Sequence, residues 1–221
     1  MFGRIIVLRY INVYIQDIPE EDIRRVEDRI GVLDLCNNSL RDVPRSVERL
    51  RNLQLILIIQ NPIQFLPDFF FRLDFLDCIL IADCLITYIP DAIANLRNLT
   101  ILAMPRNRIE YVSPYIFTMP KLECIRLDKN CIRGLYLPQN LHIGSKKIYA
   151  SDNPFNEMDL NNGLLGKITL RRVFGKNIYF TKEEEEAANP ANQKPSTLKI
   201  LMYAFLVGVI IGIIEAALGI N

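Results

Sequence analysis

The sequence predicts an α/β solenoid, in which a curved parallel sheet carries short helices or 3-10 turns on its convex side. Three observations indicate this fold. Apolar residues recur with a period of 23 residues, an asparagine follows most of the apolar strand patterns, and a proline begins several of the segments between strands. An apolar C-terminal segment adds a transmembrane helix to the predicted fold.

The period comes from segments that share the pattern L-x-x-L-x-L-x-x-N-x-L-x-x-L. Their first positions advance in five successive steps of 23 residues: Ile30, Leu53, Leu76, Leu99, Leu122 and Ser145. An earlier copy begins at Ile5, 25 residues before Ile30. One such unit cannot bury its own apolar face, so neighbouring units stack and their strands form a parallel sheet. We therefore predict seven repeats in residues 1–163.

The asparagine position is the second regular feature of the repeat. It is filled by Asn38, Asn61, Asn107, Asn130 and Asn153, with Cys84 in one repeat and Val13 in the first. We expect this side chain to satisfy backbone groups where the chain bends away from the strand. Pro44, Pro67 and Pro90 then begin the convex segments, whereas Ser113 replaces proline in the next repeat.

These motifs resemble the leucine-rich-repeat superfamily. The match is to its intracellular 23-residue class with a Leu-Pro step after the asparagine, as in Ras-suppressor-like proteins. The resemblance covers about residues 5–160. It implies recognition of other proteins and indicates no particular partner.

Residues between the inward-facing positions point to the other face of each strand, so every repeat contributes to a column on the concave side. The middle of this face is aliphatic and its ends are charged. The predicted partner-binding residues are Asp34, Leu55, Leu57, Ile59, Leu80, Ala82, Ile101, Ala103, Arg126 and Lys147. A contiguous apolar patch of this kind favours a binding surface for a protein or peptide. Two alternatives stay open: the C-terminal segment folds back over the face, or the chain is simply rich in isoleucine and leucine.

The chain changes character after the repeats. Residues 164–180 contain apolar residues around a Phe-Gly-Lys-Asn turn, which predicts a strand or hairpin that caps the last repeat. Residues 181–197 carry four consecutive glutamates and two prolines and predict a disordered, acidic linker. Residues 198–220 are predicted to form a transmembrane helix, roughly 34 Å long against a hydrocarbon layer of roughly 30 Å.

The C-terminal segment resembles a tail anchor. Lys194 and Lys199 precede it and no basic residue follows it, which predicts a single-pass protein whose repeats face the cytosol, with the endoplasmic reticulum favoured over other membranes. Small residues recur every four positions on one face of the predicted helix: Ala204, Gly208, Gly212 and Ala216. They indicate helix packing, as a homodimer or with another membrane helix, unless they reflect the ordinary composition of membrane helices.

Composition argues against several classes of function. The 26 basic and 25 acidic residues nearly cancel, and no motif for nucleic acid, nucleotide or metal is found. The five cysteines have no paired spacing, which favours a reducing compartment over a disulfide framework or zinc site. The one histidine, His142, has no partners for catalysis. We therefore expect no enzyme and no cofactor.

The sequence thus predicts a membrane-anchored adaptor or scaffold that binds a partner through the concave face. One alternative is a regulatory subunit of a signalling enzyme, in a phosphatase or small GTPase pathway, as the resemblance implies. Another is a lipid-anchored surface protein, because small residues at 187–192 precede a polar spacer and the apolar tail. Glycosylation of the sequons at Asn37 or Asn98 would favour that last alternative.

Overall fold

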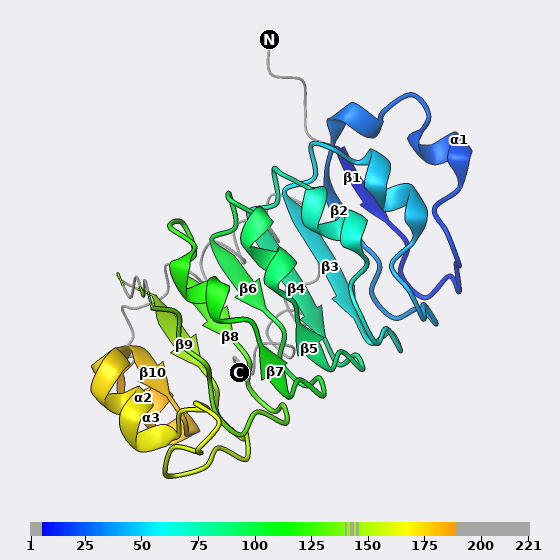
Figure 1. The fold of residues 1–221 in the computed structure, drawn as a ribbon. Helices are drawn as coiled ribbons and strands as arrows, with labels where there is room; N and C mark the ends of the chain where they lie inside the picture. Colours follow the sequence, from blue (N-terminus) through cyan, green and yellow to red (C-terminus); the bar gives the residue numbers. More distant parts are fainter. Residues whose placement is uncertain (1–5, 140, 142–143, 145, 189–221) are drawn as a thin grey trace.

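The structure is a computed structural model that describes residues 6–139, 141, 144 and 146–188. Its described part is a solenoid with a parallel sheet on one side and short helices on the other (Figure 1). The main sheet has eight strands in this spatial order: β1 (Ile6–Arg9), β2 (Ile30–Asp34), β3 (Leu55–Ile59), β4 (Cys78–Ala82), β6 (Ile101–Ala103), β8 (Cys124–Arg126), β9 (Lys147–Tyr149) and β10 (Ile178–Tyr179). A second, two-stranded sheet pairs β5 (Tyr88–Ile89) with β7 (Tyr111–Val112).

The strand register confirms the sequence period. Leu55 is paired with Cys78, Cys78 with Ile101, and Ile101 with Cys124, each 23 residues further along the chain. At the N-terminal end Leu8 is paired with Leu33, which keeps the predicted step of 25 residues. Equivalent positions of successive repeats therefore lie side by side across the sheet.

The convex side is built from short helices. They are α1 (Glu20–Ile23) and the 3-10 helices η1 (Glu27–Arg29), η2 (Arg45–Arg49), η3 (Asp68–Arg72), η4 (Asp91–Asn95) and η5 (Pro114–Thr118). Pro44, Pro67 and Pro90 stand directly before η2, η3 and η4, as the sequence predicts. Each of these three helices buries one or two apolar residues, such as Val47 and Ile93, against the sheet. The main core lies between the two layers.

The asparagines form a ladder along the solenoid. The Asn61 amide donates to the carbonyl oxygens of Leu35 at 2.9 Å and Ile59 at 3.1 Å, and its oxygen accepts from the Leu40 amide at 3.1 Å. Asn107 makes the same three kinds of bond in its own repeat. Where Cys84 replaces asparagine, its thiol donates to the carbonyls of Ile58 and Ala82 at 3.5 and 3.4 Å. The predicted role of this position is confirmed.

The residue before each asparagine or cysteine of the ladder has a left-handed backbone conformation. The set is Asn37, Gln60, Asp83, Arg106, Lys129 and Asp152, with φ between 53° and 56°. None of them is glycine, although this backbone region is unfavourable for other residues. The ladder bonds that follow stabilise the turn and so outweigh this local cost.

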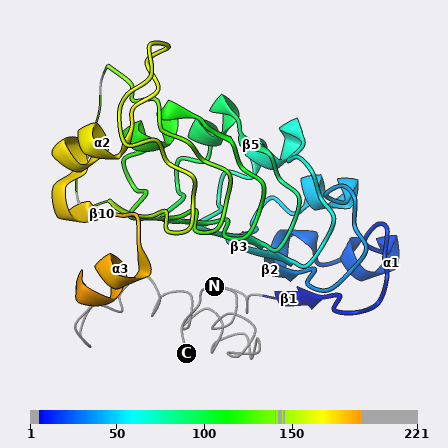
Figure 2. The ribbon, with the colours of Figure 1, turned by 90° about the horizontal axis from the view of Figure 1, so that it is seen from below.

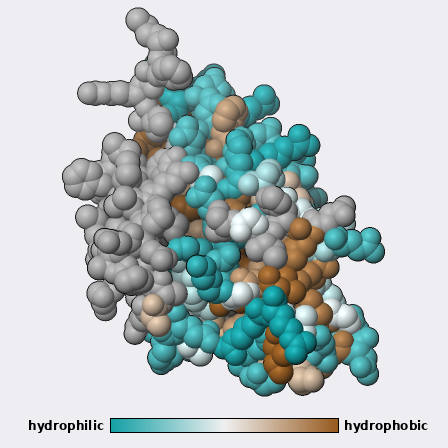
Figure 3. All heavy atoms as spheres, turned by 90° about the vertical axis from the view of Figure 1, so that its left-hand side faces the viewer, coloured by the Kyte–Doolittle hydropathy of each residue, from teal (hydrophilic) through white to brown (hydrophobic). Residues whose placement is uncertain are grey.

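The C-terminal cap differs from the predicted strand or hairpin. It begins with the helix α2 (Lys167–Phe174), continues through η6 (Gly175–Asn177) and ends in β10, which extends the sheet parallel to β9. Leu170 and Phe174 lie four residues apart on one helical face and are buried, which explains the helix. Figure 3 looks onto this end, where the described surface is mostly hydrophilic with apolar patches. A polar outer face is what the end of a stack requires.

The predicted disordered linker does not begin at residue 181, because Lys182–Ala188 form the helix α3. Thr181 starts this helix, since its hydroxyl accepts a hydrogen bond from the Glu184 amide at 3.1 Å. Within the described part of the chain, no helix has the length and apolar content needed to cross a bilayer. The rest of the linker and the predicted transmembrane helix, with Ala204, Gly208, Gly212 and Ala216, lie outside the described residues.

Candidate partner-binding face

The concave face is the side of the main sheet turned away from the 3-10 helices. Its side chains form an apolar cluster separate from the main core. The members of this concave cluster are Val32, Cys36, Leu55, Leu57, Ile59, Cys78, Leu80, Ala82, Ile101, Ala103, Cys124, Tyr149 and Tyr179. The alternation of side chains along each strand produces both clusters from the same short segments.

The structure brings the predicted aliphatic residues together. In adjacent strands Leu57 is paired with Leu80 and Leu80 with Ala103. Residues assigned to one column from the sequence therefore lie next to one another in the sheet. These side chains are buried: Leu55, Leu57 and Leu80 are 0% exposed. The role of the face in binding a partner stays a prediction.

The predicted charges lie at the two ends of the face. Asp34 on β2 is 1% exposed, and its carboxylate accepts from the Cys36 amide at 3.1 Å. Lys147 lies on β9, next to Cys124 of β8, and is partly exposed. Arg126, on β8, is 7% exposed and is therefore not the solvated flanking charge that the sequence suggested.

Arg126 is held by residues on three sides. Its Nη2 donates to Glu185 of α3 at 2.9 Å, and its Nε donates to Asp128 at 3.3 Å. The guanidinium carbon lies 4.6 Å from the centre of the Tyr149 ring, and that ring stacks on Tyr179 at 5.0 Å. A buried arginine with two carboxylates and an aromatic face is fully compensated. This cluster fastens α3 to the concave face (Figure 2).

Burial and charge shift the pKa values in this cluster. Burial alone would lower the pKa of Arg126, but the carboxylates of Asp128 and Glu185 outweigh it, so the pKa is raised. Burial raises the pKa of Glu185 although Arg126 acts in the opposite direction. Burial likewise raises the pKa of Tyr149 above its usual range. Arg126 therefore stays charged, and the tyrosine stays protonated at neutral pH.

Sequence reasoning did not single out Tyr179 or Glu185. Tyr179 comes from the cap, and the repeat pattern does not extend to it. Glu185 is one of four consecutive glutamates, which read as a solvated run. Only the tertiary structure identifies which glutamate of the run meets Arg126.

The five cysteines are all free thiols. Cys36, Cys78 and Cys124 belong to the concave cluster, Cys84 to the main core, and Cys131 is exposed. Burial raises the pKa of Cys84 to about 12. Burial also raises the pKa of Cys36 above its usual range, and the neighbouring Asp34 adds to the effect. These two buried thiols have no thiolate character at neutral pH.

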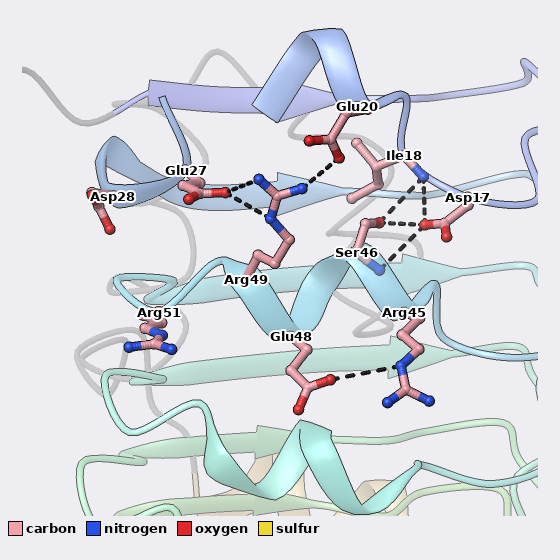
Figure 4. Close-up of a pocket in the computed structure, with 10 residues that line it drawn as sticks. All are labelled: Asp17, Ile18, Glu20, Glu27, Asp28, Arg45, Ser46, Glu48, Arg49 and Arg51. Atoms are coloured by element: carbon pink, nitrogen blue, oxygen red, sulfur yellow. Dashed lines mark hydrogen bonds and ion pairs between the residues drawn. The ribbon is translucent and has the colours of Figure 1, made fainter. Parts of the chain in front are cut away.

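A hollow lies on the convex side between the first two repeats (Figure 4). Several of its charged side chains pair with one another: Arg49, for example, bridges Glu27 at 2.6 Å and also pairs with Glu20. The carboxylate of Asp17 accepts hydrogen bonds from Ser46 and from the Ile18 amide. These contacts connect the first two repeats.

Among the described residues, no group of three or more His, Cys, Asp or Glu side chains is placed to hold a metal ion. His142 lies outside the described residues. The groups with shifted pKa values on the concave face are occupied in ion pairs and packing. The arrangement suits recognition through apolar burial.

Comparison with known proteins identifies the fold. No family model and no curated protein matches this chain. Among solved structures, one domain of similar fold is the leucine-rich-repeat domain of APL1B, with 21% identity and a TM-score of 0.58 over 68% of this chain and 44% of that one. The Leptospira interrogans protein LIC12759 is 19% identical, with a TM-score of 0.51 over 75% and 52%.

A third similar structure is the Toll–Spatzle complex of Drosophila, with 25% identity and a TM-score of 0.50 over 69% of this chain and 23% of that one. The chain thus spans about half or less of the length of these proteins. The described part of this chain has the leucine-rich-repeat fold.

Proposed function

We propose that this protein is a membrane-anchored recognition protein, an adaptor or scaffold that binds a partner protein or peptide on its concave face. The observation that carries the proposal is the concave cluster, which is separate from the main core. The solenoid already has a complete core between sheet and helices. A second aliphatic surface, on the other side of the sheet, is what we propose a partner binds through apolar burial.

The chemistry of the face indicates the kind of partner. Leu57, Leu80 and Ile101 offer aliphatic contact area in the middle, where burial supplies affinity. In this proposal the partly exposed Lys147, at the β9 end of the face, orients a ligand along the sheet. A helix or peptide with an apolar side and an acidic end fits this arrangement. The Toll structure, solved as a complex with Spatzle, is a neighbour of the same fold that has a protein partner.

The anchor in this proposal is the segment 198–220, which is apolar without interruption from Ile200 to Ile214. Its length matches the hydrocarbon layer of a bilayer. Lys194 and Lys199 favour repeats that face the cytosol, and we propose the endoplasmic reticulum as the membrane. A helix pair formed through Gly208 and Gly212 belongs to the same proposal.

The binding face is tested by a charge in its middle. Leu80→Asp places a carboxylate among aliphatic side chains, and we expect co-purification of the partner to fall at least roughly tenfold. Tyr88→Asp is the matched control, because Tyr88 lies in the same repeat, outside the concave cluster, and is exposed. Circular dichroism checks that both variants fold. A set of co-purified proteins that is the same for both variants would refute the binding face.

The anchor is tested separately by alkaline extraction of membranes, with protease protection. We expect the full chain to stay in the membrane with its repeats open to protease. A chain that ends at Thr197 is expected in the soluble fraction. Release of the full chain by alkali would refute the anchor and leave the binding face untouched.

A further inference from the structure

We infer that, outside a membrane, the apolar segment 198–220 docks on the concave cluster of its own chain. A covering layer is needed over the middle of the concave face, because Leu55 and Leu57 of β3 and Leu80 of β4 are 0% exposed. The inference concerns this contact alone and does not depend on a partner protein.

The helix α3 lies over only one end of the concave face. Glu185 pairs with Arg126 of β8, so α3 lies over the β8–β10 end of the sheet (Figure 2). Its seven residues span roughly 10 Å. β3 lies three strands beyond β8, at roughly 14 Å. Another layer is therefore needed over β2, β3 and β4.

The chain that follows α3 starts on the correct side of the sheet and is long enough. Residues 189–197 extend up to roughly 30 Å, and residues 198–220 span roughly 34 Å as a helix. The distance from β8 to β2 is four strand spacings, roughly 19 Å. A helix that begins near α3 can therefore cover the whole aliphatic part of the face. A second copy of the chain would lack this tether through α3.

The composition of the segment matches the surface. Ile200 to Ile214 contains no charged residue, and the concave cluster from β2 to β6 is made of aliphatic residues and cysteines. Joining the two removes apolar area from water on both sides. The tether keeps the local concentration of the segment high, which favours docking over association between molecules.

Docking would also affect the proposed function. Only this consequence, and not the docking itself, rests on the proposed function. One segment cannot lie in a bilayer and on the concave face together. Insertion into a membrane would therefore uncover the binding face, and a chain outside the membrane would be masked.

Native thiols report on the cover without any added probe group. Cys78 and Cys124 lie in the concave cluster, Cys84 in the main core, and Cys131 on the surface. In the full chain, without detergent or membrane, we expect maleimide to label Cys131 rapidly and Cys78 and Cys124 roughly 100-fold more slowly. Mass spectrometry of peptides assigns each site.

The full-length variant with Ile210→Asp and Ile213→Asp tests the segment itself. We expect Cys78, on β4, to become nearly as reactive as Cys131, while Cys84 stays slow and Cys124, on β8 under α3, changes less. The matched control carries the same two added charges in the linker, at Asn192→Asp and Gln193→Asp, and should keep the slow rates. Unchanged protection of Cys78 in the tail variant would overturn the inference. So would protection of the wild-type chain that disappears on dilution, because a second copy would then be the cover.

A crosslinking measurement covers the case in which the tail variant loosens the fold and Cys84 also reacts. Single cysteines are placed at positions 206–213 in a Cys131→Ser background, and a mild oxidant is added. At least one position should form a disulfide with Cys78 or Cys124 within one chain. Absence of such a bond at every position, or bonds only between chains, would overturn the inference. Neither measurement involves a membrane or a partner, so a negative result would leave the proposed function standing.

Discussion

Single side chains decide how the chain turns at the end of each strand. Asn38, Asn61 and their equivalents bond to backbone groups of their own repeat and of the preceding one. The left-handed residue before each of them places the side chain in reach of both. Cys84 shows that a thiol can hold the same position with longer contacts. The ladder therefore connects repeats through buried polar contacts as well as through apolar packing.

Replacement of Asn61 by alanine tests the ladder. The change leaves the Leu40 amide and the carbonyls of Leu35 and Ile59 without this partner in a buried site. We expect the free energy of unfolding to fall by about 3 kcal/mol, measured by urea denaturation. Asn52→Ala is the control, since Asn52 makes one bond, to the Asp28 carbonyl, at an exposed site. A loss as small as that of the control would contradict the role of the ladder.

At the scale of elements, the residue before each of the 3-10 helices η2 to η5 fixes the backbone conformation from which the helix begins. Proline does this before η2, η3 and η4, whereas Ser113 does it before η5. Ser113 is fully buried, and its hydroxyl accepts from the Tyr115 amide and donates to Asp91 at 2.7 Å. Its own amide donates to the Ile89 carbonyl at 3.0 Å. The departure from the repeat pattern thus provides bonds that proline cannot make.

Ser113→Pro restores the pattern and is nevertheless expected to destabilise the protein. The φ of −53° suits proline, but the bond to Ile89 and the bond to Asp91 are lost. We expect a loss of about 2–4 kcal/mol in thermal or urea unfolding. Ser113→Ala keeps the backbone bond and should lose only about 1 kcal/mol. A proline variant as stable as the wild type would show that these bonds contribute nothing.

The helix α3 is expected to respond to pH through Glu185. Burial raises the pKa of this carboxyl above its ordinary 4.5, so the folded chain binds this proton more tightly than the unfolded chain does. Its contribution to stability is full below pH 4.5 and is lost as the pH rises through the raised pKa. Glu185→Gln removes this dependence. The stability of the variant relative to the wild type should therefore increase from pH 4 toward pH 7.

Urea unfolding at several pH values measures this difference. Glu183→Gln, in the same helix, should give the opposite sign: hydrogen bonds from the backbone and from Thr181 lower the pKa of Glu183, so the stability of this variant relative to the wild type should decrease from pH 4 toward pH 7. A difference for Glu185→Gln that stays constant with pH would contradict the raised pKa.

At the scale of the whole molecule, stacking exposes two ends that need covering. The N-terminal end has α1, η1 and the ion pairs of Arg49. The C-terminal end has α2, whose Phe174 ring lies 5.4 Å from that of Phe117, and β10, after which Phe180 packs on Phe155 at 4.9 Å. These aromatic contacts join the cap to the last repeats. The stability of the stack therefore depends on them.

Phe174→Ala is expected to lower the free energy of unfolding by about 3–5 kcal/mol, because it leaves a cavity between cap and repeats. Ile168→Ala, at an exposed position of the same helix, should cost less than about 1 kcal/mol. Hydrogen exchange should show protection lost first in β9 and β10. Uniform loss across all repeats would contradict a role local to the cap.

The sequence by itself determined the repeat, the parallel sheet, the register of 23 residues, the role of the asparagines and the columns of the concave face. It could do so because strand alternation and repeat length are local, periodic properties. The tertiary structure decided what depends on distant contacts. These are the helical cap, the left-handed turns at non-glycine residues, the helix α3, and the burial of the concave cluster. Glu185 and Arg126 are separated by 59 residues, and no local pattern encodes their pairing.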